Sequence, residues 1–235
     1  MVERMVLVSG AAAVGKTAFI RHLLSSLRSK VNPCFAKIDC LQTDDDQIFR
    51  QLKIPSIAGL SDDICPDHFL VSNMHELIDW TEKMGGNFLI VETAGLCHRC
   101  CPASVKTINI CIVDCTVSVR SPKKLGPMLT TADMIVLSKI DLVSQAEREI
   151  ISAMIADLPD LNPTARIFPI DGLCGYGVEL LAREILITPK VESFEGDLLR
   201  YSMPAGVCSY CIGEQRIGKE FQQGVVRKIN FEGGA

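Results

Sequence analysis

The sequence lacks any hydrophobic run long enough to cross a membrane, and its basic residues form no cluster. Lys and Arg number 24 against 28 Asp and Glu, so the formal net charge is −4. A chain without a basic patch offers little to the phosphate backbone of a nucleic acid, and one without about 20 consecutive apolar residues offers no membrane span. The N-terminus also lacks the charged and apolar segments of a secretory signal. We therefore expect a cytoplasmic protein that binds neither nucleic acid nor membrane.

Cysteine, by contrast, is abundant, with 11 residues in a chain of 235. In a reducing compartment these thiols are not expected to form disulfides. Cys34, Cys111 and Cys115 lie within apolar segments and are interpreted as small core residues. The remaining cysteines gather in short motifs that need another explanation.

Residues 10–17 read GAAAVGKT and match the phosphate-binding pattern G-x-x-x-x-G-K-[ST]. The glycines let the backbone wrap around an anion, and the amides at the helix N-terminus point at phosphate oxygens. Lys16 supplies a point charge for the β- and γ-phosphates, and Thr17 a hydroxyl for magnesium. We expect the nucleotide to be bound by Gly10, Ala11, Ala12, Ala13, Val14, Gly15, Lys16, Thr17 and Ala18.

Strand-like and helix-like segments alternate over residues 1–187, which predicts an α/β fold. Strands are expected at 5–8, 33–39, 88–92, 108–115, 134–138 and 166–170, and helices near 16–29, 75–84, 121–131, 144–157 and 176–187, with a short helix ending at Leu52 and an irregular stretch at 53–73. The prediction is a P-loop NTPase domain with a mostly parallel central sheet, helices on both faces and ligands at the carboxyl ends of the strands. Residues 188–235 are expected to form a small C-terminal extension, with a strand-like alternation at 224–231.

Two strand ends offer carboxylates beside the phosphate loop. Glu92 ends the predicted strand 88–92 and is expected to hold magnesium, and Gly95 lets a backbone amide approach and sense the γ-phosphate. Asp39 ends the strand 33–39 and is interpreted as a further magnesium ligand, as a group that positions the attacking water, or as a plain turn residue. Lys16, Asp39 and Glu92 are the predicted catalytic residues.

A base-binding motif follows the strand 134–138. The carboxylate of Asp141 can accept both the ring N–H and the exocyclic amine of guanine, a donor pair that adenine does not offer, and the stem of Lys139 can lie across the base. Ser138 stands where Asn or Thr is usual, which weakens the selectivity argument. Asp171 lies where a further base-contacting loop is expected. The motif favours GTP over ATP.

A dense cysteine cluster comes directly after Gly95. Cys97, Cys100 and Cys101 are spaced so that their thiolates can chelate one transition-metal ion, and His98 could add a nitrogen. Two or three ligands do not make a closed structural site, so the pattern favours an ion that is handed on.

Two further sulfur motifs are weaker. Cys65 and His68 form a sulfur–nitrogen pair for which coincidence and metal ligation are equally good interpretations. Cys208 and Cys211 form a C-x-x-C pair, interpreted as a metal site, a redox pair or half of a zinc knuckle.

The phosphate loop, the segment Glu92–Gly95 followed closely by Cys101-Pro102, and the motif 138–141 resemble those of the SIMIBI-class metallochaperone GTPases, the CobW/HypB/UreG-like family. This family includes the nickel-insertion GTPases for hydrogenase and urease. The resemblance covers about residues 1–187. The chain has only four histidines, and the histidine-rich nickel store of some members is absent from its N-terminal segment.

The resemblance implies that GTP binding and hydrolysis, with Mg²⁺, drive dimerisation and the delivery of nickel, or of zinc or cobalt, to a target metalloenzyme or its maturation proteins. A homodimer that shares the metal site is the natural expectation. The main alternative is an iron–sulfur cluster assembly or metalloenzyme-activating ATPase with a cysteine-bound cluster at its dimer interface. A nucleotide-gated scaffold without turnover and a small-molecule kinase are weaker alternatives.

Overall fold

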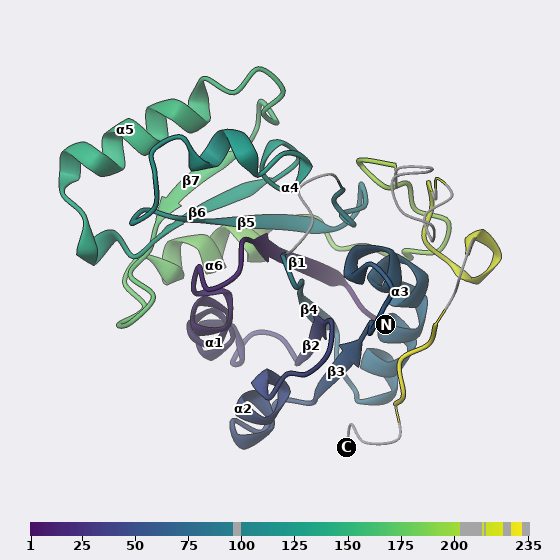
Figure 1. Ribbon diagram of the computed structural model, residues 1–235. Helices are drawn as coiled ribbons and strands as arrows, with labels where there is room; N and C mark the ends of the chain where they lie inside the picture. Colours follow the sequence, from purple (N-terminus) through teal and green to yellow (C-terminus); the bar gives the residue numbers. More distant parts are fainter. Residues whose placement is uncertain (96–99, 203–212, 214, 223–226, 232–235) are drawn as a thin grey trace.

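The computed structural model describes residues 1–95, 100–202, 213, 215–222 and 227–231, and these form an α/β fold around one sheet (Figure 1). The sheet has seven strands in the order β3-β2-β4-β1-β5-β6-β7, and every pair of neighbours is parallel. The strands are β1 (Arg4–Gly10), β2 (Pro33–Asp39), β3 (Ser56–Leu60), β4 (Phe88–Glu92), β5 (Ile108–Asp114), β6 (Met134–Ser138) and β7 (Arg166–Pro169). The predicted fold class is confirmed.

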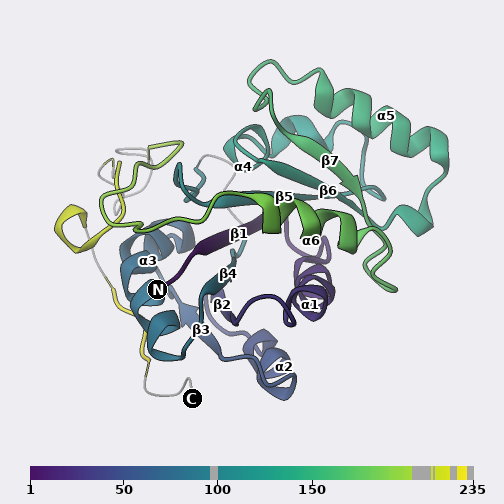
Figure 2. The same ribbon diagram turned by 180° about the vertical axis from the view of Figure 1, so that it is seen from behind.

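Successive side chains of each strand point to opposite faces, and both faces are covered. Alternate strand residues such as Val6 and Ile90 pack under α1 (Lys16–Leu27), α2 (Asp45–Gln51) and α6 (Val178–Ile187). On the other face, Leu7 and Val91 lie under α3 (Pro66–Lys83), and Cys111 lies in the core near α4 (Pro127–Thr130) and α5 (Gln145–Ala156). Figures 1 and 2 show these helices on the two sides of the sheet.

The prediction that residues 53–73 are irregular is wrong, because β3 and the first half of α3 occupy most of this stretch. Helix α3 begins at Pro66, a residue well suited to the first turn of a helix. Its residues from Pro66 to Met74 are all buried, so the apolar spacing of a surface helix never develops there. The helix expected near 121–131 is interrupted at Gly126, whose φ is 55°, and splits into η1 (Ser121–Lys124) and α4.

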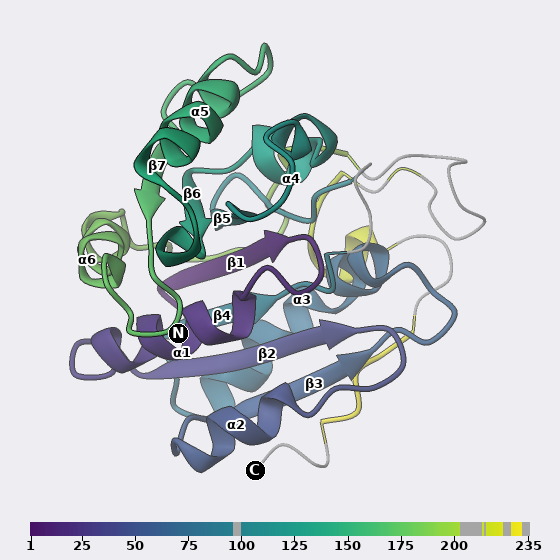
Figure 3. The same ribbon diagram turned by 60° about the vertical axis from the view of Figure 1, so that its left-hand side comes forward.

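The described residues beyond Ile187 pack against the domain rather than standing apart from it. Phe194, Leu199, Ile217 and Ile229 are buried in the same cluster as α3. The side chain of Asn73 on α3 donates to the carbonyl oxygen of Arg227 and accepts from the amide of Ile229. Figure 3 shows this tail running beside α3. Residues 224–226 of the expected strand 224–231 lie outside the described residues, and residues 227–231 form no strand.

Three short 3₁₀ helices complete the described elements: η1, η2 (Ile140–Leu142) and η3 (Lys219–Phe221). Cys34, Cys111 and Cys115 are buried, as predicted. Within the described residues, no helix combines the length and the apolar character needed to cross a membrane.

Candidate functional site

The loop between β1 and α1 has the geometry of an anion cradle. Gly10 has φ 139°, and a Cβ there would lie 2.6 Å from the carbonyl oxygen of Ile112. Gly15 has φ 93° and precedes α1 without any side-chain cap, so the first amides of the helix remain available to a ligand. Buried Lys16 donates to the carbonyl oxygens of Gly10 at 3.0 Å and Ala11 at 2.9 Å. Its ammonium group therefore lies over the loop where phosphate is expected.

A group of carboxylates surrounds the hydroxyl of Thr17. This hydroxyl lies 3.0 Å from Glu92 Oε2 and 3.3 Å from Asp45 Oδ2. Glu92 is only 1% exposed, and burial raises the pKa of its carboxyl. Hydroxyl and carboxylate oxygens are the ligands that Mg²⁺ prefers, so this donor set fits the ion that Thr17 and Glu92 were predicted to hold.

The predicted residue Asp39 lies at the rim of this group. Its Oδ1 accepts from the amide of Cys40 at 2.8 Å, which is the contact of a turn residue, while its Oδ2 lies 3.8 Å from Lys37 Nζ. Sequence reasoning missed Asp45, the first residue of α2. It also missed Lys37, whose position in mid-strand gave no sign that its side chain points at Glu92. The signal that could have found it is a charged residue in an otherwise apolar strand.

Gly95 lies directly against the phosphate loop. With φ 73°, it approaches the loop so closely that an added Cβ would fall 1.8 Å from the carbonyl oxygen of Gly10 and 3.1 Å from Lys16 Nζ. The residue predicted to sense the γ-phosphate thus touches both the first glycine and the lysine of the loop. Only a glycine fits this position.

Three of the predicted base-binding residues, Ser138, Lys139 and Asp141, line one pocket beside α1. The cavity has a volume of about 220 Å³, and its other lining residues include Val14, Phe19 and Leu173. Ser138 donates to the carbonyl oxygen of Val14 at 2.8 Å and so ties this motif to the phosphate loop. The apolar walls and the single carboxylate suit a flat base with hydrogen-bond donors on one edge.

Asp114 at the end of β5 is a further residue that the sequence did not indicate. Lys139 donates to its Oδ2 at 2.6 Å, which places the lysine stem along the pocket. Burial opposes ionisation here, but hydrogen bonds from Lys139 and Thr116 outweigh it and lower the pKa of the Asp114 carboxyl. The predicted residue Asp171 bonds instead to the amides of Leu173 and Cys174 in its own turn.

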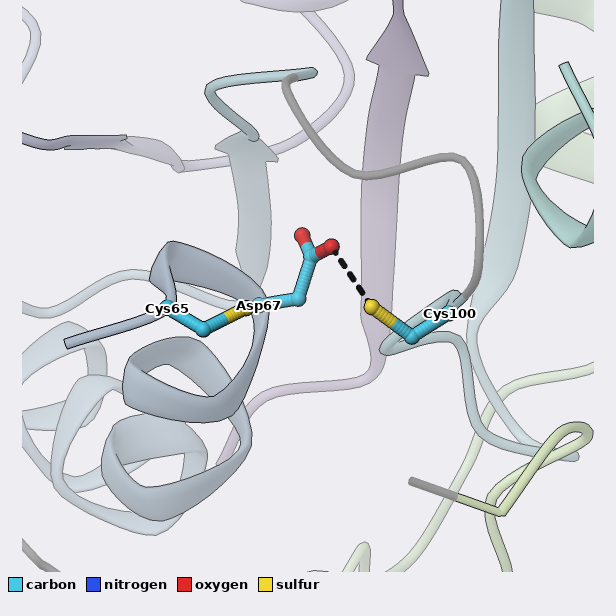
Figure 4. Close-up of side chains that lie close together, drawn as sticks. All are labelled: Cys65, Asp67 and Cys100. Carbon is cyan, nitrogen blue, oxygen red and sulfur yellow. Dashed lines mark hydrogen bonds between the residues drawn. The ribbon is translucent and has the colours of Figure 1, made fainter. Parts of the chain in front are cut away.

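On the α3 side of the sheet, two cysteines and a carboxylate meet. Cys65 precedes α3, Asp67 lies in its first turn, and Cys100 comes from the other side (Figure 4). One potential ligand atom from each lies within 4.8 Å of the other two, and Cys100 Sγ is 3.1 Å from Asp67 Oδ2. Two thiols and a carboxylate are a suitable partial ligand set for zinc, nickel or cobalt.

The environment of this cluster favours a reactive sulfur at Cys65. A hydrogen bond from the Cys100 thiol, followed by backbone hydrogen bonds at the start of α3, lowers the pKa of Cys65 to about 6. Burial raises the pKa of Asp67 to about 7. A thiolate available at neutral pH is the form of cysteine that binds metal ions.

The other predicted metal ligands lie in different places. The buried sulfur of Cys101 accepts hydrogen bonds from Asn109 at 3.6 Å and Thr131 at 3.5 Å, and the group of three close ligand atoms is that of Cys65, Asp67 and Cys100. His68 is fully buried in the first half of α3. The predictions for Cys97, Cys208 and Cys211 fall outside the described residues. Asp67 was missed, although it stands between two residues that were singled out.

This cluster is connected to the phosphate-loop side of the sheet in two ways, one covalent and one electrostatic. The chain itself runs from Glu92 through Gly95 to Cys100. The second connection is at the end of β2. Cys40, which follows Asp39, interacts electrostatically with Cys65 and Asp67. The nucleotide side and the sulfur side are thus joined at the carboxyl edge of the sheet.

A family model described as "CobW/HypB/UreG, nucleotide-binding domain" matches residues 4–169, which hold every described element from the phosphate loop to β7. The chain belongs to the CobW/HypB/UreG family. This finding confirms the resemblance seen in the sequence motifs.

Two curated relatives illustrate the family's range. An uncharacterized protein of Methanocaldococcus jannaschii is 40% identical over 228 residues, which cover 97% of this chain and 96% of the relative. The urease accessory protein UreG 1 of Saccharopolyspora erythraea is 28% identical over 159 residues, which cover 64% of each chain.

Solved structures share the fold of this family member. HypB of Helicobacter pylori, determined in complex with nickel, has a TM-score of 0.63 at 20% identity and covers 78% of this chain and 86% of its own. The hydrogenase maturation factor HypB of Archaeoglobus fulgidus has a TM-score of 0.62 at 22% identity, with coverage of 78% and 89%. At these identities the likeness establishes the P-loop fold alone.

Proposed function

We propose that this protein is a GTP-binding and GTP-hydrolysing metallochaperone, in which the state of the nucleotide controls the binding and release of a transition-metal ion. Family membership supports the nucleotide-binding part. The observation that carries the coupling is the position of Gly95, which touches the phosphate loop at one end of a short segment whose other end bears Cys100.

In the proposed nucleotide complex, the loop amides and Lys16 hold the β- and γ-phosphates. The oxygens of Thr17, Glu92 and Asp45 form the site for magnesium, which neutralises phosphate charge when bound. Asp39 stands at the rim of this site, where a group that orients the attacking water is needed. Hydrolysis by this arrangement relies on positioning and on charge stabilisation rather than on a covalent intermediate.

Selectivity for guanine is assigned to the pocket above α1. Asp141 accepts from the two donors on one edge of guanine, while the stem of Lys139, held by Asp114, lies along the base. Adenine presents an acceptor where guanine presents its ring N–H, so it would leave the Asp141 carboxylate poorly paired.

In the proposed metal site, Cys65 and Cys100 provide thiolates and Asp67 a carboxylate. Cys65 and Asp67 are fixed to α3, whereas Cys100 belongs to the segment that starts at Gly95. Movement of Gly95 when the γ-phosphate is lost would separate Cys100 from the other two and weaken the site. Nickel is the favoured ion, and zinc and cobalt suit the same ligands. Because the ligand set is partly open, a homodimer in which a second copy completes the site is favoured. The open set also favours transfer of the ion to a recipient, which we propose is a metalloenzyme or its maturation protein.

The test is to purify the protein anaerobically, determine its metal content, and measure its affinity for Ni²⁺, Co²⁺ and Zn²⁺ with GDP and with a non-hydrolysable GTP analogue. We expect at least a tenfold difference in affinity between the two nucleotide states. Equal affinities would contradict the coupling, and competition by ATP as effective as by GTP would contradict the base assignment.

Variants Cys65→Ser and Cys100→Ser should each weaken metal binding in both nucleotide states. Cys174→Ser is the matched control, because Cys174 is an exposed cysteine on the turn after β7. If the control alters metal affinity as much as the two test variants do, the ion is bound elsewhere.

A further inference from the structure

Lys37 brings a positive charge into the middle of the predicted magnesium site. It is 6% exposed, and the parallel register pairs it with Glu92, so both side chains point to the face covered by α1 and α2. Its Nζ lies 2.5 Å from Glu92 Oε1, 3.1 Å from Asp45 Oδ2 and 3.8 Å from Asp39 Oδ2. Glu92 and Asp45 are also the carboxylates that contact the hydroxyl of Thr17.

We propose that Lys37 is a tethered cation, which occupies the place of Mg²⁺ while the nucleotide site is empty and competes with the ion for the same oxygens. Without a cation, three carboxylates at this partly buried site would repel one another. The ammonium group of Lys37 provides positive charge from within the chain, in addition to that of Lys16, which also interacts with Glu92 and Asp39. Because it is covalently attached, it is present at every stage, and a divalent ion must displace or share its partners.

This arrangement has a consequence for the order of binding. Mg²⁺ alone would meet carboxylates whose charge is already partly neutralised, and an ammonium group that repels it. Mg²⁺ that arrives with a nucleotide brings phosphate charge that offsets this repulsion. The inference rests on the proposed nucleotide site. In that site, Lys37 would weaken the binding of Mg²⁺ that arrives without a nucleotide.

The test uses the whole chain, freed of nucleotide and metal, with the neutral variant Lys37→Met. Without Mg²⁺ the variant should melt below the unmodified protein, because the buried Glu92 carboxylate loses its closest cation. Added Mg²⁺, with no nucleotide present, should then raise the melting temperature of the variant with a half-saturating concentration at least tenfold below that of the unmodified protein.

The matched control is Lys190→Met, which removes the exposed hydrogen-bonded pair of Lys190 with Glu3 far from the site. It should leave the response to Mg²⁺ unchanged. An equal response of Lys37→Met and the unmodified protein to Mg²⁺ would overturn the proposal. Neither measurement requires GTP hydrolysis or a transition metal, so this outcome is separate from a failure of the proposed function.

A second measurement needs no variant and decides the matter if Lys37→Met does not fold. Buried lysine ammonium groups can be followed by ¹H–¹⁵N correlation spectroscopy of the unmodified chain. We expect the Lys37 ammonium signal to shift or broaden when Mg²⁺ and GDP are added together, and to change far less with GDP and a chelator. A signal that is unaffected by Mg²⁺ with GDP would overturn the proposal.

Discussion

Gly95 and Gly10 are in such close contact that the space for a Cβ at Gly95 is already taken by the carbonyl oxygen of Gly10, 1.8 Å from the position that the Cβ would occupy. Gly10 begins the phosphate loop, and Gly95 begins the segment that leads to the buried thiol of Cys100. A change in the backbone conformation at Gly10 would therefore displace Gly95.

Replacing Gly95 by alanine should lower the free energy of unfolding by roughly 3 kcal/mol or more, because positive φ and a backbone clash act together. Chemical denaturation measures this change. The control is Gly85→Ala, since Gly85 also has a positive φ of 75° but no atom near its would-be Cβ. The control should cost only about 1 kcal/mol. Equal losses in the two variants would show that the contact with Gly10 is unimportant.

Lys16→Ala should reduce GTP turnover by at least about a hundredfold while leaving the fold intact. The side chain bonds only to backbone oxygens of its own loop among the contacts described above. Turnover assays and circular dichroism together test this prediction. Retained turnover in a folded variant would refute the phosphate role.

Asp141→Asn should weaken GTP binding by at least about tenfold and should favour xanthosine triphosphate, because the amide can donate where the carboxylate only accepts. Titration with fluorescent nucleotides measures both affinities. Glu149→Gln, on the exposed face of α5, is a suitable control for loss of one negative charge. Unchanged affinity for GTP in Asp141→Asn would remove the guanine assignment.

Cys65 should react with iodoacetamide at lower pH than the other described cysteines. A lowered pKa of about 6 means that the thiolate is present above that pH and is lost as the pH falls through it. In the metal-free protein, the alkylation rate should reach half its maximum near pH 6, as followed by site-resolved mass spectrometry.

The variant Cys100→Ala removes the main hydrogen bond that lowers this pKa. It should move the reactivity profile of Cys65 toward that of an ordinary thiol, near pH 9. Cys174→Ser should leave the profile in place. If Cys100→Ala has no effect, the two sulfurs are not hydrogen-bonded in solution.

The sequence predicted those parts of the molecule that local patterns determine. The loop 10–17 and the strand 88–92 are recognisable because glycine, lysine and short apolar runs have few other uses in that order. Helix α3 was predicted only in its second half, since its first half is buried on all sides by the sheet and the tail. The alternation of apolar and polar residues that marks a half-exposed helix is therefore absent from this half.

One cause explains why sequence reasoning missed several residues of the site. Lys37, Asp45 and Asp67 act through partners that are distant in the chain, and no spacing rule links position 37 to position 92. Parallel strands bring such positions together through the sheet order, which here places β4 between β1 and β2. The Cys97–Cys101 pattern suggested one cluster, but the described sulfurs have different partners: Cys100 lies beside Asp67, whereas Cys101 accepts hydrogen bonds from Asn109 and Thr131.

Asn73 gives the last described stretch of the chain a direct connection to α3. Its amide group satisfies backbone atoms of both Arg227 and Ile229, and Ile229 lies within the same cluster as Leu70 and Met74. A chain that ended at Ile187 would leave this amide and the outer apolar side of α3 open to water. Any event that detaches residues 227–231 must therefore also loosen the helix whose first turn carries Asp67.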